Sequence, residues 1–396
     1  MSSTDHTARD RTPPAPALLL WLSYVGFVSL GLPDTVLGAA WPAMRTELGL
    51  PLDAAGAAVL VTMAGVVISS TASGWLRLHV SAGVVLSGST ILAALALIGS
   101  GFAPHWYVLL MAAGVAGLGG GAIDATLNDH VARHHSARHM NWLHACWGVG
   151  AAIAPNVVAF FLARGQSWRT AYLALGAVEA LLALSFIATR SLWRDDVVAA
   201  RSGDEGQWTA TPSRGAAHAS VAMFYCYGGL EAGTGLWAAS LLAGTRNVSL
   251  AGAGASVGLY WGALCAGRFV IGAWADRWGP ARVLATTVWV ALAAVVALAL
   301  PGTPAWFVIL ALAALGFSLA PIYPLAMHDT PRRFTGAAGV RLVGRQVAAT
   351  AIGVASLPWL LGVIAARIAL EWLPAMLIVL AVAVIALERT RRSGST

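Results

Sequence analysis

Long apolar stretches separated by short polar breaks follow one another along almost the whole chain. Each stretch reaches the length of roughly 20 residues that an α-helix needs to cross about 30 Å of hydrocarbon. Charged residues, proline or glycine-rich segments bound each of them. We therefore predict twelve membrane-spanning helices, near residues 17–43, 54–76, 81–101, 105–130, 140–163, 168–190, 217–244, 251–275, 280–301, 305–327, 336–364 and 369–388.

The longest polar stretch inside the chain divides the predicted spans into six and six. We interpret it as a cytoplasmic linker between two six-helix bundles. The expected organisation is an N-terminal tail at 1–16, an N-terminal bundle at 17–190, the linker at 191–216, a C-terminal bundle at 217–388 and a C-terminal tail at 389–396. The predicted fold class is therefore an all-α membrane protein.

The two halves of the sequence resemble each other at a nearly constant offset. SGWLRLHVSAGVVL (73–86) aligns with IGAWADRWGPARVL (271–284), and GLGGGAIDATLNDH (117–130) aligns with GFSLAPIYPLAMHD (316–329). Repeats of this kind are typical of secondary transporters, which bind their substrate near the midplane between the repeats. We therefore expect two pseudo-symmetric bundles with a shared site between them.

The composition excludes an ordinary soluble enzyme. Of the 396 residues, 58% are hydrophobic and only 10% are charged, with a mean hydropathy of +0.73, whereas soluble domains are about a quarter charged. The sequence holds no phosphate-binding loop, dinucleotide-binding fingerprint or nucleophile motif. We expect neither an enzyme nor an ATP-driven pump, and no cofactor or metal. Cys146, Cys226 and Cys265 stand singly in apolar spans and are interpreted as packing residues.

The positive charge is explained by membrane topology. All 24 basic residues are arginine, and the net charge is +7. Most arginines outside the spans lie on the side that holds both termini, and the opposite loops hold only Arg45, Arg164, Arg169, Arg246 and Arg367. Because cytoplasmic loops carry the excess of basic residues, we predict cytoplasmic termini in a bacterial inner membrane. The expected state is a monomer in the bilayer, without nucleic acid as a partner.

The loop between the eighth and ninth predicted helices reads GAWADRWG (272–279). It resembles the loop signature of the major facilitator superfamily, in which an Asp and an Arg form a charge lock between helices. The resemblance implies the twelve-helix fold of that superfamily and gives the gating role to Asp276 and Arg277. The N-terminal copy, GWLRLHVS, keeps Arg77 but lacks the Asp, so a symmetric lock is not expected.

Four further stretches resemble the fucose-permease-like branch of that superfamily, the fucose–galactose–glucose:proton symporters. They are GLPDTVLGAAWP (31–42), AIDATLN (122–128), NWLHACWGVG (141–150) and GLEAGTGLW (229–237). The resemblance implies proton-coupled uptake of a sugar, with Asp34 and Asp124 as coupling and binding groups. Fucose permeases have the longer Glu at the position of Asp124. The shorter reach of Asp124 leaves the identity of the sugar open.

Acidic residues inside predicted spans are the first functional candidates, because a charge at the centre of a membrane helix costs about 2.5–3.5 kcal/mol on insertion scales. Asp34 follows Pro33, and proline disrupts helical hydrogen bonding. We predict that Asp34, Asp124 and Glu231 exchange protons and contact the substrate. The alternative for each is a structural hydrogen bond to a neighbouring helix, which we favour for Glu179.

Polar and aromatic residues near these acids complete the predicted substrate site. Asn128 lies one helical turn after Asp124, and its amide can both donate and accept hydrogen bonds. Aromatic rings pack on the apolar faces of sugars while polar groups bond the hydroxyls. The predicted contacts besides the acids are Asn128, Asn141, His144, Trp147, Tyr227 and Trp237. The alternatives are a helix contact through the amide of Asn128, an interfacial Trp with a satisfied buried His on the fifth span, and a structural role for the cluster around Glu231.

Three arginines lie within or at the ends of apolar runs, namely Arg268, Arg341 and Arg345. Since arginine keeps its charge, we predict that they form gating ion pairs; binding of an anionic substrate is the alternative. The histidines of HVARHHSARH (130–139) are interpreted as a titratable cytoplasmic loop. No carboxylate or cysteine at ligand spacing completes a metal site with them.

The leading functional hypothesis is a secondary transporter that takes up a neutral sugar or polyol with protons by alternating access. An exporter of amphipathic drugs or metabolites is the alternative within the same fold. A membrane receptor or scaffold would need neither paired halves nor several buried acids. Sodium in place of the proton also stays open, because carboxylates and broken-helix carbonyls can hold Na⁺.

Overall fold

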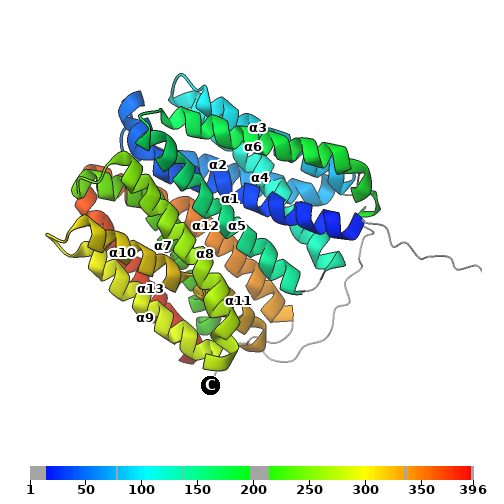
Figure 1. The fold of residues 1–396 in the computed structure, drawn as a ribbon. Coiled ribbons are helices and arrows are strands. Elements are labelled where there is room, and N and C mark those ends of the chain that lie inside the picture. Colours follow the sequence, from blue (N-terminus) through cyan, green and yellow to red (C-terminus); the bar gives the residue numbers. More distant parts are fainter. Residues whose placement is uncertain (1–14, 77–78, 136, 197–213, 334–336, 394–396) are drawn as a thin grey trace, which may run out of the picture.

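Helices make up every regular element of the computed structural model, which describes residues 15–76, 79–135, 137–196, 214–333 and 337–393 (Figure 1). The α-helices are α1 (Ala15–Leu48), α2 (Ala54–Leu76), α3 (Ala82–Gly101), α4 (Trp106–His134), α5 (Ala137–Ala163), α6 (Trp168–Thr189), α7 (Arg214–Thr245), α8 (Leu250–Trp278), α9 (Pro280–Ala299), α10 (Ala305–Leu319), α11 (Ile322–Arg333), α12 (Ala337–Arg367) and α13 (Leu373–Ser393). Two short 3-10 helices are η1 (Arg190–Asp196) and η2 (Leu370–Trp372).

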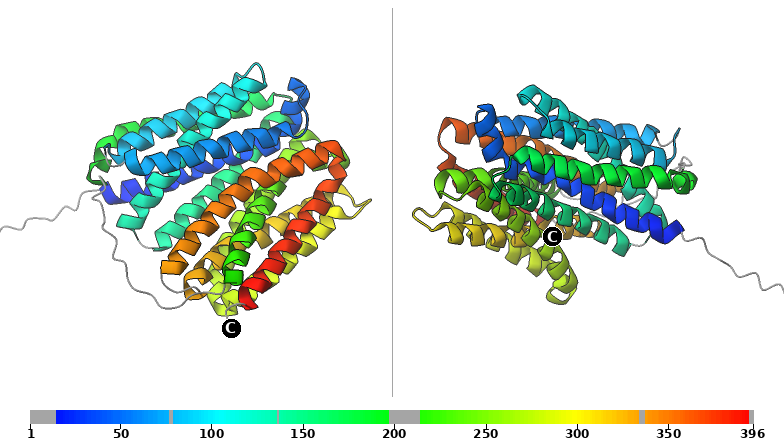
Figure 2. Two further views of the ribbon diagram at one scale, coloured as in Figure 1. Left: turned by 180° about the vertical axis from the view of Figure 1, so that it is seen from behind. Right: turned by 45° about the horizontal axis from the view of Figure 1, so that its top comes forward.

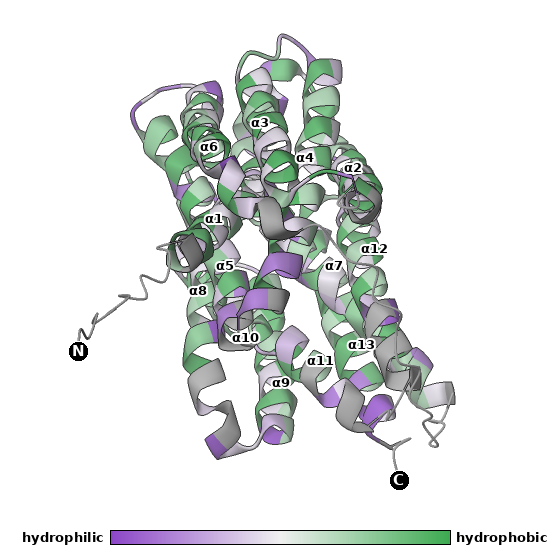
Figure 3. Ribbon diagram, turned by 90° about the vertical axis from the view of Figure 1, so that its right-hand side faces the viewer, coloured by the Kyte–Doolittle hydropathy of each residue, from purple (hydrophilic) through white to green (hydrophobic). Residues whose placement is uncertain are grey.

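An α-helical segment lies at each of the twelve predicted positions, so the predicted fold class is confirmed. The tenth span, predicted as one helix over 305–327, is divided into α10 and α11 around Pro321. A proline inside a helix removes a backbone donor, and its ring clashes with the preceding turn, which explains the interruption. Hydrophobic residues predominate along the helices, and hydrophilic ones gather at their ends (Figure 3).

Eleven segments of the described chain are long and apolar enough to cross a membrane, judged by length and composition alone. Helix α7 is not among them. It carries Glu231 and many glycine, serine, threonine and tyrosine residues. Because α7 packs against α1, α8, α12 and α13, its side chains are surrounded by protein, and it can carry polar groups that a lipid-facing helix would not.

The same helix pairs pack in both halves of the molecule. In the first half these pairs are α1 with α5, α2 with α4 and α3 with α6; in the second they are α7 with α12, α8 with α10 and α9 with α13. Even the close approaches recur, since Gly117 on α4 lies against the Thr62 carbonyl and Gly316 on α10 lies against the Tyr260 carbonyl. A side chain at either glycine would collide with backbone, so the helices meet at equivalent points.

The two halves contact each other through α5 with α8, α2 with α12 and α1 with α7. Their closest approaches join Gly258 with Asn156, Gly56 with Trp359, and Gly38 with Gly235. All of these lie toward the end of the molecule opposite to the chain termini, which we call the far end. The halves diverge from there toward the end that holds the termini (Figure 2).

Candidate functional site

Asp34 of α1 meets Trp147 of α5 in the middle of the molecule. Gly150 on α5 lies against the Val28 carbonyl of α1, an approach that leaves no room for a side chain. This crossing brings the Trp147 indole beside α1, and its N–H donates to Oδ2 of Asp34 at 2.9 Å. The Asp34 side chain is exposed although it lies in a long apolar helix, so the carboxylate faces an open space between helices.

Asp124 of α4 is the second exposed acid of the first half. The Asn128 amide, one turn later, donates to its Oδ1 at 3.1 Å and to its backbone carbonyl at 3.0 Å. Asp34 and Asp124 are near enough for their charges to interact. Among the described residues, neither acid takes part in an ion pair, and both are hydrogen-bonded by neutral groups.

Helix α5 presents further predicted residues to the same region. His144 is exposed, and its ring stands edge-on to that of Phe27, with 5.4 Å between the ring centroids. The side chain of Asn141 lies outside the described residues, so its predicted contact stays a prediction. His144 therefore lies one turn before Trp147 on α5, whose indole bonds Asp34.

Glu231 of α7 is the acid of the second half, and it is held by a cation. Its carboxylate lies 3.8 Å from the Arg268 guanidinium of α8. The Tyr227 hydroxyl donates to the same carboxylate, and the Tyr260 hydroxyl donates to the Glu231 backbone carbonyl at 3.0 Å. Arg268, predicted to form an ion pair, thus has Glu231 as its partner.

A chain of polar contacts joins the two halves. The Arg268 guanidinium lies 5.6 Å from the centroid of the Trp147 ring, within the range of a cation–π interaction. Trp147 in turn bonds Asp34, and Arg268 pairs with Glu231. This chain of contacts, Asp34–Trp147–Arg268–Glu231, therefore runs from α1 through α5 and α8 to α7, and it contains an acid from each half.

Sequence reasoning missed three aromatic residues at this site. The Trp261 ring stands edge-on to Trp147 at 5.6 Å, and the ring of the preceding residue, Tyr260, stands edge-on to Trp261 at 5.0 Å. Tyr323 of α11 is near enough to feel the charges of Glu231, Arg268 and Asp124. The internal repeat could have predicted Tyr323, because the alignment of 117–130 with 316–329 places it opposite Asp124.

Other predicted residues lie away from this chain of contacts. Trp237 is buried in the core of the second half, and its indole N–H donates to the Pro358 carbonyl at 2.8 Å. Arg277 is exposed and lies over the Trp274 ring at 5.0 Å, and Arg345 is exposed. The side chains of Asp276 and Arg341, and all of Arg77, lie outside the described residues, so the predicted charge lock stays a prediction.

The histidines between α4 and α5 form a cluster of rings. The His130 ring lies against His134 at 4.6 Å and against Trp193 of η1 at 4.7 Å, both in tilted arrangements, and His135 stands edge-on to His139 at 5.4 Å. Burial, and then the charges of His130, His139 and His134, lower the pKa of His135. In the part of the chain that the structure describes, no group of His, Cys, Asp or Glu side chains has the arrangement of a metal site.

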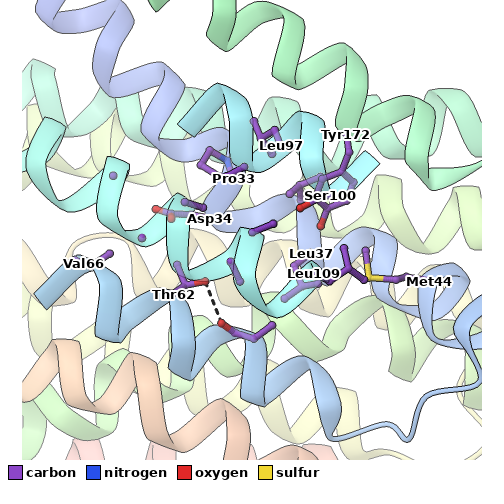
Figure 4. Close-up of a pocket in the computed structure, with 18 of the residues that line it drawn as sticks. Pro33, Asp34, Leu37, Met44, Thr62, Val66, Leu97, Ser100, Leu109 and Tyr172 are labelled. Atoms are coloured by element: carbon purple, nitrogen blue, oxygen red, sulfur yellow. Dashed lines mark hydrogen bonds between the residues drawn. The ribbon is translucent and has the colours of Figure 1, made fainter. Parts of the chain in front are cut away.

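A crevice extends from Asp34 into the first half, between α1, α2, α3, α4 and α6 (Figure 4). Asp34 and Val66 lie at one side of it, whereas Met44 lies at the other. Thr62 is one of its polar residues, and its hydroxyl donates to the Ala58 carbonyl at 3.0 Å. The site thus combines a polar region between the halves with an apolar extension within one half.

These features define a class of protein: a multi-pass membrane protein whose two similar halves enclose a polar site, the layout of secondary transporters. The family model described as the Major Facilitator Superfamily matches residues 23–349. The chain belongs to the major facilitator superfamily and is a transporter of small molecules in a membrane.

Solved structures share this fold. A bacterial homolog of the human lysosomal transporter Spinster, in an inward-facing and occupied conformation, is 12% identical with a TM-score of 0.78, and 97% of each chain is covered. The nucleoside transporter NupG is 13% identical with a TM-score of 0.70 over 96% of this chain and 99% of that chain. No curated protein matches the sequence. These likenesses concern the fold, and they do not single out the fucose-permease-like branch.

Proposed function

We propose that the protein takes up a neutral sugar or polyol together with protons, by alternating access. The observation that supports this most is the chain Asp34–Trp147–Arg268–Glu231, which couples an acid of each half through an indole and a cation. A change of charge on one acid alters the interaction between the halves. Such a change in relative energy is what coupled transport requires, because a ligand shifts a conformational equilibrium only by binding one state better.

Asp34 and Asp124 are the proposed coupling groups. Both are exposed to the open space, and their described partners, Trp147 and Asn128, are neutral donors. Either acid can therefore bind a proton without breaking an ion pair, and a proton on one of them relieves their mutual repulsion. Sodium is the alternative coupling ion, since carboxylates can also hold Na⁺.

A neutral substrate fits the charges better than an anionic one. Arg268 is the described cation at the centre, and Glu231 already compensates its charge. An anion would have to compete with that carboxylate. The hydrogen-bonding groups of Asn128, His144 and the surrounding tyrosines and tryptophans instead suit hydroxyl groups, as a polyol requires.

The conformation is consistent with the release side of an uptake cycle. The halves approach closely at the far end, whereas Asp34, Asp124 and His144 are exposed. If the termini are cytoplasmic, as the arginine distribution predicts, the site opens toward the cytoplasm of a bacterial cell. An exporter of amphipathic molecules is the second candidate, and the apolar crevice beside Asp34 favours it.

The experiment is sugar uptake into energised membrane vesicles, with the external pH recorded as each sugar is added. We expect uptake with alkalinisation of the medium for the wild type, and loss of both for Asp34→Asn with Asp124→Asn. Asp53→Asn, in the loop before α2, is the matched control and keeps both signals. Full-rate uptake by the double variant would refute coupling through these acids, and cargo leaving energised vesicles of this orientation would favour the exporter.

A further inference from the structure

The crevice beside Asp34 is narrow, with a cavity volume of about 80 Å³ and a mouth that is open to solvent. Its lining is mostly apolar, from Leu30 and Leu37 of α1 to Leu97 of α3 and Leu109 of α4. The deep end is formed by side chains that are largely buried, such as Met44 and Tyr172. The crevice is thus a cavity with a polar mouth and an apolar interior.

The crevice is not a necessary result of the way these helices cross. Gly117 against Thr62 and Gly316 against Tyr260 mark the same crossing in the two halves. The crevice of the first half is lined there by Thr62, Ala113, Ala116 and Gly120. At the corresponding offsets the second half has Tyr260, Leu312, Leu315 and Leu319, all fully or almost fully buried. The second half fills its counterpart with large side chains, whereas the first half leaves the space empty.

The crevice is continuous with the proposed substrate site. On α4, Ala113, Ala116 and Gly120 are followed at helical spacing by Asp124 and Asn128 on the same face. On α1, the apolar residues that line the crevice surround Asp34. A molecule whose polar part contacts Asp34 and Asp124 would therefore have its other end at the entrance of an apolar cavity.

Water is a poor occupant for the interior. The Thr62 hydroxyl is already bonded to the Ala58 carbonyl, and most of the surrounding wall is made of alkyl groups, with Ser100 and Tyr172 as its further polar residues. A mostly apolar wall gives a water molecule few hydrogen-bond partners and favours a small apolar group. Burying such a group gains about 25 cal/mol for each Å² of apolar surface. A ligand that places an apolar group in the crevice would therefore bind more tightly than one that does not.

We infer that the crevice receives an apolar substituent of the transported molecule, whose polyol part is held beside Asp34 and Asp124. This inference rests on the proposed function and narrows it. The substrate class becomes glycosides with an aryl or short alkyl group, rather than free monosaccharides. It also explains why one site carries features of both a sugar transporter and a transporter of amphipathic molecules.

The test compares matched ligands on the purified full-length protein. Binding of methyl and phenyl β-D-glycosides of galactose, glucose and fucose is measured by thermal shift and titration calorimetry. We expect the phenyl member of the recognised pair to bind about tenfold tighter or more, because its ring enters the crevice. Equal affinity of the two members would overturn the inference and leave the proposed function standing. Absence of binding by every glycoside would overturn both.

Filling the crevice provides the second arm of the test. Ala116→Leu places in the first half the residue that Leu315 supplies in the second, so the fold has a precedent for it. We expect this variant to bind both glycosides with the affinity of the methyl member. Ala177→Leu, on the exposed face of α6, adds the same volume elsewhere and should keep the tenfold preference. Ala113→Leu repeats the test at a second position, and a preference that survives both crevice variants would overturn the inference.

Discussion

The two halves of the transporter share their helix crossings but treat buried acids in opposite ways. In the C-terminal half, Glu388 of α13 is 3% exposed and forms ion pairs with Arg391 at 2.7 Å and Arg392 at 2.6 Å. Asp329 of α11 joins Arg391 at 2.9 Å. In the N-terminal half, Glu179 of α6 is 1% exposed, and it forms no ion pair with a described residue.

The same difference appears at the centre of the molecule. Glu231 in the C-terminal half is paired with Arg268, whereas Asp34 and Asp124 in the N-terminal half are bonded by neutral groups. Glu231 and Glu388 are therefore ion-paired in the C-terminal half, and proton binding to them would break those pairs. The N-terminal half can change its charge at little structural cost, so we expect proton coupling to reside in it.

The largest expected effect is on the two buried glutamates. Glu388→Gln removes one of the two acids paired with the fully buried Arg391 and leaves Asp329 as the other; breaking a buried ion pair costs up to about 3–5 kcal/mol of unfolding free energy. Glu179→Gln removes no ion pair, so the unfolding free energy should stay within about 1 kcal/mol of the wild type or rise. Denaturant titration of the purified protein in detergent measures both values.

Arg367→Gln, an exposed arginine at the far end of α12, is the control for loss of a charge. A Glu179→Gln variant as unstable as Glu388→Gln would show that Glu179 is charged and paired, and it would remove the contrast between the halves.

The helices were predictable from the sequence because the length of an apolar run is a direct requirement of the bilayer. The interruption of the tenth span at Pro321 was not predicted, because proline is tolerated in membrane helices when neighbours satisfy the backbone. The extension of α13 to Ser393 was also missed, since the charged residues after 388 resembled a solvated tail. Arg391 is instead buried in an ion-pair network that joins residues from distant parts of the chain.

The candidate site was predictable in its acids but not in its contacts. A charged side chain inside the bilayer has a high free-energy cost, so an acidic residue in an apolar run is a functional candidate. Asp34, Asp124 and Glu231 were predicted for that reason. The bond from Trp147 to Asp34 depends on how closely α1 and α5 cross, which is determined by Gly150 and cannot be read from spacing. Trp237 was predicted to contact the substrate as Trp147 was, yet its indole bonds the Pro358 carbonyl in the core.

A smaller effect is expected where the two halves meet. Arg268→Met and Glu231→Gln each leave a charge without its partner, whereas the double variant leaves neither charge. The double variant should therefore lose less unfolding free energy than the sum of the single variants, by about 1–2 kcal/mol. Denaturant titration of the four proteins gives this coupling energy.

A second double-mutant cycle, with Asp34→Asn and Arg268→Met, measures how strongly the N-terminal acid is coupled to the same arginine. Trp147 stands between these two residues, so their coupling should be smaller than that of the ion pair. Equal coupling in the two cycles would mean that Asp34 is held by Arg268 as directly as Glu231 is, and the N-terminal acid would then not be free to change its charge.

The smallest effect concerns pH and the histidine cluster of the N-terminal half. Burial and the neighbouring charges of His130, His139 and His134 lower the pKa of His135 in the folded protein, while the unfolded chain keeps a value of about 6.5. As the pH falls below 6.5, the unfolded chain binds this proton before the folded protein does. The contribution of neutral His135 to the unfolding free energy is therefore fully present above pH 6.5 and is lost progressively as the pH falls below it.

His135→Gln should flatten this part of the stability curve. The melting temperature of the variant, measured from pH 8 to pH 5, should fall less below pH 6.5 than that of the wild type, by a small margin because the side chain is only half-buried. His218→Gln, at an exposed position of α7 in the C-terminal half, should follow the wild-type curve. A steeper curve for His135→Gln would mean that the folded protein favours the charged ring, in which case the cluster stabilises positive charge and this difference between the halves has the opposite sign.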